Sequence, residues 1–413
     1  MKIGRDSTEG EIVTVIVVGD ARVVFGDCRD VLKTLADCSV DSVVTDPPYE
    51  LGFMGKKWDS TGIAYDVTVW EECLRVLKPG GHVLAFGGSR TWHRMAVAIE
   101  DAGFEIRDSI AWMYGSGFPK SLDVSKAIDK AAGYQGEVIG TETVDIGIQG
   151  GSMHAGRSQK LEEREIRELS SEAKQWQGWG TALKPAFEPI VVGRKPFAKG
   201  STVAANVLEH GVGGLNIDAS RIDAKGRPLI EKTGEKWAGS NMDSAGSKAV
   251  GATDLGRWPA NVILDEYSAG LLDEQSGENP SRFFYCAKAS KRDRNEGLDG
   301  LEDKQAVGGG GGIGDYLDDV DSASGKFGSE KAPAKNFHPT VKPTTLMRYL
   351  IKLVTPAGGT VLDPFTGSGS TGKAALLDGY KFVGAELTEE YLPIIEGRLR
   401  WAYEQEADDE TLF

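Results

Sequence analysis

The 413-residue sequence has few of the residues that would build a metal site, a disulfide scaffold or a membrane anchor. Its four cysteines and five histidines stand singly, without the C-x-x-C or H-x-x-x-H spacing of a zinc site or redox pair. It has no run of about 18 apolar residues to span a bilayer, and its first residues lack the pattern of an export signal. We therefore expect a soluble cytoplasmic protein without a metal.

Positive charge is also scarce. The chain has 47 Lys and Arg against 62 Asp and Glu, a net charge of -15. Such a protein repels polyanions at long range, so nucleic-acid binding would need a local basic surface. The 40% of hydrophobic residues supplies a large core, and the length predicts two domains or one elaborated domain.

Both ends of the chain alternate short Val- and Ile-rich runs with helical stretches, the pattern of buried parallel strands in an α/β fold. Helices are expected at 67–77, 91–102, 344–354, 370–378 and 389–403. Strands are expected at 11–18, 22–25, 42–45, 82–86, 105–113, 360–362 and 381–385. The two ends should therefore form two halves of one sheet.

The middle of the chain is less regular. It shows one clean buried strand at 187–192, a predicted solvated helix at 158–176 and a flexible glycine loop at 307–314. We therefore divide the chain into five parts. These are a first core part at 1–115, an insertion at 116–182, a core strand within 183–196, a longer insertion at 197–335 and a second core part at 336–413.

The motif Asp46-Pro47-Pro48-Tyr49 directly follows the expected strand 42–45. It stands at the carboxyl end of a strand, where open α/β sheets bind ligands. The prolines fix the backbone and remove two N–H donors, so the Asp46 carboxylate and the Pro47 carbonyl can only accept hydrogen bonds. Such a cluster suits an amino group, and Tyr49 offers a face for stacking a heterocycle. The alternative is a strand that is simply stopped by proline.

A second motif, residues 363–371 (DPFTGSGST), joins a strand to a helix through a glycine loop. Its spacing fits neither the dinucleotide fingerprint nor the P-loop, which disfavours NAD and ATP. Glu386 ends the next strand, where an acid can bind two ribose hydroxyls. The glycines allow close approach and the helix start favours a carboxylate, so the motif suits S-adenosylmethionine. The alternative is an ordinary strand-to-helix turn with a surface glutamate.

Two weaker motifs complete the set. Residues 338–343 (HPTVKP) lead into a helix and make Lys342 available for a carboxylate. Residues 25–28 (FGDC) end an early strand, where Asp27 could accept a hydrogen bond from an adenine amino group.

Together the four motifs resemble the DNA amino-methyltransferases, which methylate exocyclic nitrogens of bases, in the circularly permuted order of the β class. The resemblance covers roughly residues 20–115 and 336–400. It implies a Rossmann-like, seven-stranded methyltransferase sheet with 197–335 as a target-recognition region. Residues 112–120 and 179–185 also resemble phage and prophage members, which implies the cytoplasm of a bacterium or of a phage-infected host.

The resemblance implies methyl transfer from S-adenosyl-L-methionine to N6 of a flipped-out adenine in double-stranded DNA, and it leaves a homodimer open. Catalysis is expected at Asp46, Pro47, Pro48 and Tyr49. The expected cofactor contacts are Asp27, Cys28, Asp46, Lys342, Asp363, Phe365, Gly367, Ser368, Gly369, Ser370, Thr371 and Glu386.

Several alternatives remain beside adenine N6. Cytosine N4 has the same amine geometry, although this class more often begins the motif with Ser for cytosine and with Asp for adenine. An RNA substrate and an inactive DNA-binding protein are further alternatives. Attack at cytosine carbon-5 needs a Pro-Cys nucleophile, which the sequence lacks. A flipped base needs aromatic partners, for which we consider Phe53, Trp58 and Trp112.

The best candidate for phosphate contacts is the basic run 281–294, in which aromatic residues are interleaved with basic ones and Asp293 is the single acid. Its alternative is a solvated charge run. Arg194, Lys195 and Lys199 form a smaller second cluster. The basic residues of the run are Arg282, Lys288, Lys291, Arg292 and Arg294.

Overall fold

The computed structural model describes residues 14–51, 57–115, 121–145, 161–224, 226–236, 245–287, 291–302 and 335–410. The chain divides into two compact units. The first comprises 1–113, 188–298 and 342–413, and the second comprises 114–187 and 299–341. In the part of the chain that is described, no helix is long and apolar enough to cross a membrane.

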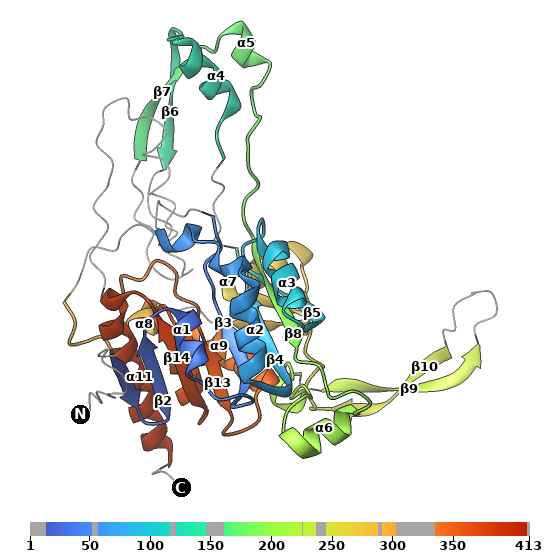
Figure 1. Ribbon diagram of the computed structural model, residues 1–413. Coiled ribbons are helices and arrows are strands. Elements are labelled where there is room, and N and C mark those ends of the chain that lie inside the picture. Colours follow the sequence, from blue (N-terminus) through green and yellow to red (C-terminus); the bar gives the residue numbers. More distant parts are fainter. Residues whose placement is uncertain are drawn as a thin grey trace. The chain divides into compact units, whose positions relative to one another are not determined.

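The first unit is built on a ten-stranded mixed sheet in the order β1-β2-β14-β13-β3-β4-β8-β5-β11-β12 (Figure 1). The neighbouring pairs from β2 to β4 are parallel, and β8 is antiparallel to β4. The strands are β1 (Val15–Val18), β2 (Ala21–Phe25), β3 (Val40–Thr45), β4 (Leu77–Phe86), β5 (Glu105–Met113), β8 (Phe187–Arg194), β11 (Val262–Asp265), β12 (Tyr285–Ala287), β13 (Thr360–Asp363) and β14 (Lys381–Glu386).

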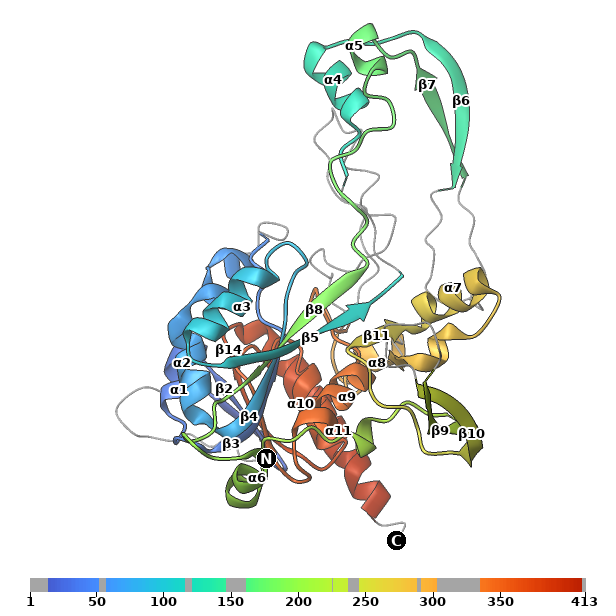
Figure 2. The same cartoon turned by 90° about the vertical axis from the view of Figure 1, so that its right-hand side faces the viewer.

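The expected seven-stranded sheet is the run from β2 to β5 in this order, and β1, β11 and β12 extend it. Helices α1 (Cys28–Lys33), α2 (Val67–Val76) and α3 (Trp92–Asp101) cover one face of the sheet (Figure 2). The other face is covered by α9 (Thr344–Val354), α10 (Ser370–Leu376) and α11 (Leu392–Glu410). The unit also contains α6 (Val203–His210), α7 (Glu266–Ser276), α8 (Lys291–Asn295) and the hairpin of β9 (Arg227–Lys236) and β10 (Ala245–Thr253).

The centre of the sheet is its most buried part. All six residues of β3 are buried, as expected for a strand covered by helices on both faces. Parallel pairing with β13 on one side and β4 on the other brings the ends of these strands to one edge. Glu386, the last residue of β14, lies at the same edge, in register with Phe25. The fold therefore gathers the residues that follow β3 and β13 beside Glu386.

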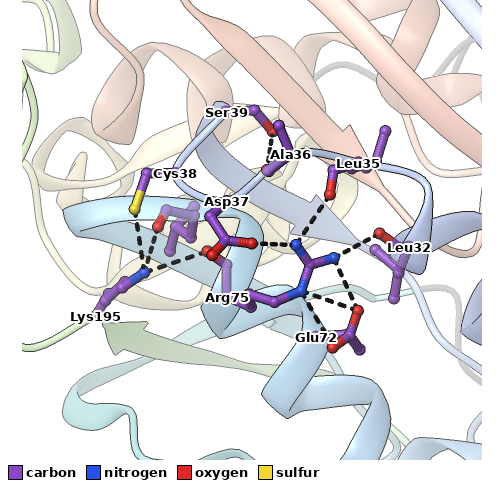
Figure 3. Close-up of polar contacts among 10 residues, drawn as sticks. Leu32, Leu35, Ala36, Asp37, Cys38, Ser39, Glu72, Arg75 and Lys195 are labelled. Atoms are coloured by element: carbon purple, nitrogen blue, oxygen red, sulfur yellow. Dashed lines mark hydrogen bonds and ion pairs between the residues drawn. The ribbon is translucent and has the colours of Figure 1, made fainter.

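Polar contacts around Arg75, in the last turn of α2, join this helix to the end of α1 and the turn that follows it (Figure 3). Its guanidinium donates to the Leu32 carbonyl at 2.9 Å and pairs with Glu72 at 2.9 Å. Lys195 donates to the Arg75 carbonyl at 3.4 Å. Arg194, at the end of β8, is 9% exposed and forms an ion pair within the unit. Arg194 and Lys195, two residues of the predicted second basic cluster, thus make contacts within the fold, at the end of β8 that lies away from Glu188.

The second unit holds α4 (Val124–Ala132), α5 (Ser171–Lys174) and the antiparallel hairpin of β6 (Val138–Asp145) and β7 (Leu161–Arg167). The helix predicted over 158–176 is therefore wrong, since residues 161–167 form a strand and the helix has four residues. The strand is stabilised by pairing with β6, a partner that the local sequence does not reveal. The predicted glycine loop 307–314 lies outside the described residues.

Candidate functional site

Asp46 lies just beyond β3 and meets Lys342, which stands two residues before α9. The Lys342 ammonium is 2.7 Å from Asp46 Oδ2, 3.2 Å from Glu188 Oε2 and 3.1 Å from the Tyr49 hydroxyl. Lys342 is 7% exposed. The motifs around Asp46 and Lys342, some 300 residues apart, therefore form one buried cluster.

Glu188 was not singled out by the sequence analysis, although residues 187–192 were correctly expected to form a buried strand. The Tyr49 hydroxyl donates to its carboxylate at 2.7 Å. Because β8 runs antiparallel to β4, its first residues lie at the edge where β4 ends. The signal in the sequence was an acid inside an apolar run, and strand direction was the missing information.

The electrostatics of this cluster follow from burial and close charges. Burial by itself lowers the pKa of Lys342, but the carboxylates of Asp46 and Glu188 outweigh it and raise the pKa above its ordinary value. Burial, with the same two carboxylates, raises the pKa of Tyr49 well above its ordinary value. Lys342 thus stays an ammonium and Tyr49 a neutral phenol, and the cluster holds two carboxylates and one cation.

The two carboxylate oxygens of Asp46 differ in their contacts, since Oδ2 is paired with Lys342 and Oδ1 is not. Oδ1 is buried, and it has no hydrogen-bond partner among the described residues. Pro47 and Pro48 bring no N–H donor to it. A buried acceptor without a donor is rare and costly, so this atom suits a ligand that brings an N–H group.

Asp363, at the end of β13, is held entirely inside the protein. It accepts hydrogen bonds from the Thr45 and Thr371 hydroxyls, each at 2.6 Å, and from the Phe365 amide at 3.0 Å. Burial raises the pKa of Asp363 to about 6. Thr371 is 2% exposed. Asp363 and Thr371 therefore brace the loop from within.

Glu386 holds the glycine loop of residues 363–371 at Gly367. Its carboxylate accepts the backbone N–H groups of Gly367 and Thr388, each at 2.7 Å. Burial raises the pKa of Glu386 to about 7. Gly367 and Gly369 have φ angles of 54° and 74°, a left-handed conformation that glycine adopts without strain. An ionised carboxylate still has lone pairs for two hydroxyl donors, so the residues fit a ribose.

The hydroxyls of the loop also point inward. Arg398 of α11 is fully buried and donates to the Ser368 carbonyl at 2.8 Å and the Ser370 hydroxyl at 3.0 Å. Burial lowers the pKa of Arg398 to about 10. Phe365 and Gly367 are the partly exposed members of the loop. A ligand over the loop would therefore meet a phenyl ring and backbone.

Asp27 and Cys28 lie close to Glu386, since the Gly26 amide donates to the Glu386 carbonyl at 2.8 Å. Asp27 caps α1 and pairs with Arg29 at 2.5 Å, and the hydrogen bond from Arg29 lowers the pKa of Asp27. Cys28 is buried, which raises the pKa of its thiol to about 12. Both residues thus contribute to the start of α1.

The structure separates the predicted basic run into two parts. Arg282 lies before β12, in a 3-10 helix at Pro280–Phe283, and Arg292 and Arg294 lie after β12, on α8. Arg292 has a side chain that is 86% exposed. Lys288 and the side chain of Lys291 lie outside the described residues.

The single acid of the run, Asp293, attaches α8 to the core. It accepts from the Thr344 amide at 2.8 Å and pairs with the fully buried Lys373 at 2.6 Å. Thr344 begins α9, two residues after Lys342. The α8 part of the run is therefore attached to the start of α9, the helix that follows Lys342.

Of the aromatic candidates, Trp112 packs edge-on against Phe86, with ring centroids 6.3 Å apart. The Lys342 ammonium lies 4.9 Å from the centre of the same Phe86 ring. Trp112 thus lies one residue away from the cluster. Phe53 and the side chain of Trp58 lie outside the described residues.

Comparison with known families supports the same conclusion as the motifs. A model of the N6 and N4 DNA methylases matches residues 40–397. The chain belongs to this DNA methylase family. Its members are S-adenosylmethionine-dependent methyltransferases. The match spans both halves of the candidate site and the whole stretch between them.

Individual relatives match shorter stretches. The type II methyltransferase M.HindIII of Haemophilus influenzae is 29% identical over 146 residues, 35% of this chain and 36% of that protein. The DNA adenine methyltransferase YhdJ of Escherichia coli is 40% identical over 72 residues, 17% of this chain and 24% of that protein. The chain thus spans about a third or less of the length of these relatives.

Solved structures match over most of the chain at low identity. The cytosine-N4-specific PvuII DNA methyltransferase covers 94% of this chain and 90% of its own, with 14% identity and a TM-score of 0.43. The M1.HpyAVI complex with S-adenosylmethionine covers 92% and 98%, with 16% identity and a TM-score of 0.38.

Proposed function

We propose that this DNA methylase transfers a methyl group from S-adenosylmethionine to an exocyclic amino nitrogen of a base in double-stranded DNA. The observation that carries the proposal is the buried Oδ1 of Asp46, which has no partner among the described residues. It stands at the edge that Glu386 and the glycine loop share. An amino group is the ligand class that supplies the missing donor.

The residues act mainly by position. Bound S-adenosylmethionine supplies a methyl group that is already activated as a sulfonium. Glu386 would accept its ribose hydroxyls, and Phe365 with the backbone at Gly367 would line its site. Asp46 Oδ1 and the Pro47 carbonyl would accept the two amine N–H groups, which localises the nitrogen lone pair and stabilises charge that develops in the transition state.

Lys342 keeps the Asp46 carboxylate oriented, because it holds Oδ2 while Oδ1 stays open. The target amine is buried in the base stack of a duplex, so the base must be flipped out at a cost of a few kcal/mol. The Tyr49 ring would then stack against it, with its hydroxyl anchored by Glu188. We infer adenine N6 as the target because the motif begins with Asp, and cytosine N4 is the second candidate.

We also propose that the α8 part of the basic run contacts DNA phosphates. Arg292 is exposed, and α8 is attached beside the helix that follows Lys342. For a chain with a net charge of -15, such binding is local and strongly dependent on salt.

The test is methylation of unmodified genomic DNA with methyl-labelled S-adenosylmethionine, followed by digestion to nucleosides and mass spectrometry. The expected product is N6-methyladenine. N4-methylcytosine would instead support the second candidate. If duplex DNA stayed unlabelled while RNA was labelled, or if neither was labelled, the proposal would be wrong.

A further inference from the structure

We propose that Glu188 gives the catalytic cluster its excess negative charge and thereby makes the site prefer the cationic methyl donor over the uncharged thioether product. The inference rests on the proposed function, because it concerns the same donor. It assigns to Glu188 a role in choosing between the two forms of the cofactor, and with it a role in product release.

The first observation is the charge count around Lys342. Asp46 and Lys342 would form a neutral pair by themselves, with 2.7 Å between the charged atoms. Glu188 adds a second carboxylate 3.2 Å from the same ammonium. The Lys342 side chain is 8% exposed, and each of the two carboxylate side chains is 19% exposed. The cluster therefore carries one negative charge that Lys342 does not balance.

The second observation is that Glu188 bonds to side chains of the cluster. Its Oε2 accepts from the Tyr49 hydroxyl and the Lys342 ammonium. Both contacts require a hydrogen-bond acceptor at this position, which a carboxylate or an amide oxygen can supply. Glutamine has nearly the same shape and retains the acceptor, so the charge can be removed separately from the contact.

The chemistry of the transfer places the donor's charge against this cluster. In the proposed reaction the methyl group would have to meet the amine held by Asp46, so the sulfonium of the bound donor would face Asp46. The nitrogen forms its bond to the methyl carbon while the carbon–sulfur bond breaks and its electron pair remains on sulfur. The amine then loses a proton to solvent, and the cofactor product is neutral at sulfur. An unbalanced carboxylate in a poorly solvated site attracts the reactant's cation and has much less effect on the product.

The experiment is calorimetric titration of the full chain with S-adenosylmethionine and, separately, with S-adenosylhomocysteine. For Glu188→Gln we expect the affinity for the sulfonium to fall roughly tenfold, the effect of losing about one unit charge nearby, while the thioether affinity changes less than about twofold. Sinefungin, which carries an ammonium at this position, should follow the sulfonium.

Three matched variants separate charge from shape. Glu188→Asp restores the charge and should restore most of the preference. Tyr49→Phe removes the hydroxyl bond and keeps all charges, so the ratio of the two affinities should stay unchanged. Glu209→Gln alters net charge equally, at a side chain that is 72% exposed, and should change neither affinity.

Two results would overturn the inference. Equal weakening of both ligands in Glu188→Gln would mean that Glu188 acts by shape, and unchanged affinities would mean that its charge does not reach the cofactor. A wild-type protein that bound neither ligand would instead overturn the proposed function, and this inference with it.

Discussion

The acids along the edge of the central sheet divide into two groups that differ in how their oxygens are satisfied. Glu386 and Asp363 are held by the protein's own donors, namely backbone amides and threonine hydroxyls. Asp46 is paired at one oxygen with Lys342, and its other oxygen is buried and has no hydrogen-bond partner in the described part of the chain. The contacts of the first group keep a loop in shape, whereas we propose that Asp46 receives the target amine.

This difference predicts which step each group serves. Donors that are already in place make the loop a preformed binding site, and binding to such a site contributes equally to ground and transition state. An open acceptor at the reacting nitrogen contributes most when charge develops there. Substitutions in the two groups should therefore separate cofactor affinity from the rate of transfer.

The largest expected effect is that of Asp46→Ala. It should lower methyl transfer by about a thousandfold or more, because the amine loses the acceptor that stabilises its developing charge. Cofactor affinity should stay within a few-fold, since the carboxylate is assigned to the amine. Calorimetry with S-adenosylmethionine and a methylation assay on the same preparation measure the two halves. Substantial residual transfer would show that Asp46 does not hold the target amine.

Glu386→Ala should have a smaller effect, and the effect should be on cofactor affinity and not on the rate of transfer. We expect cofactor binding to weaken by about 1.5 to 3 kcal/mol, the usual value for hydrogen bonds to a charged group, with little change in the saturated rate. Thr388→Ala is a useful control, because the Thr388 contact to Glu386 comes from the backbone amide, which alanine retains. An unchanged affinity in Glu386→Ala would remove this residue from the cofactor site.

Much of the fold could be predicted from the sequence. The helix at 344–354 and the strand at 105–113 have the expected bounds. For both elements, the structure expected from the local residue pattern is the one that the folded core stabilises. In the insertion the local pattern and the fold disagree, and residues 161–167 form a strand because of a partner about 20 residues earlier. Long-range pairing of this kind has no local signal.

The sequence predicted which residues lie at the candidate site better than it predicted what each of them contacts. Asp46, Tyr49 and Lys342 were expected, and the structure brings them together. Thr371 was expected to meet the cofactor, yet it binds Asp363 inside the protein. Glu188 was missed because its place depends on the direction of β8. A motif identifies the residues of a site, but their orientation is decided by packing.

The raised pKa of Glu386 also predicts that cofactor binding depends on pH. Burial raises the pKa of Glu386 to about 7, so in the free protein its neutral form is favoured below that pH. Only the carboxylate can accept both ribose hydroxyls beside two amides, so affinity should rise from pH 6 to pH 8 by up to about tenfold and then level off. Titrations across this range measure it.

The stability of the free protein should change with pH in the opposite direction to the cofactor affinity. A raised pKa means that the stabilising contribution of Glu386 is complete below its ordinary value of 4.5 and is lost as the pH rises through about 7. Glu386→Gln removes the titrating group and should flatten both profiles. If the affinity profile kept its slope in this variant, another group would be responsible.

The smallest expected effect concerns a surface outside both groups of acids. Arg292→Ala should weaken binding to all duplexes about equally, by a few-fold at moderate salt, and reduce the log-log salt slope by about one unit, because one phosphate contact is lost. Cofactor affinity should not change, and the set of methylated sequences should stay the same while their methylation slows, since phosphate contacts position a protein without reading bases. Arg282→Ala is the matched control from the other part of the run. Arg282 precedes β12, whereas α8 follows it and is attached two residues from Lys342, so we expect the larger effect at Arg292.

Equal effects would mean that the whole run contacts DNA, as the sequence by itself predicts. An unchanged salt slope in both variants would identify the run as a solvated charge surface.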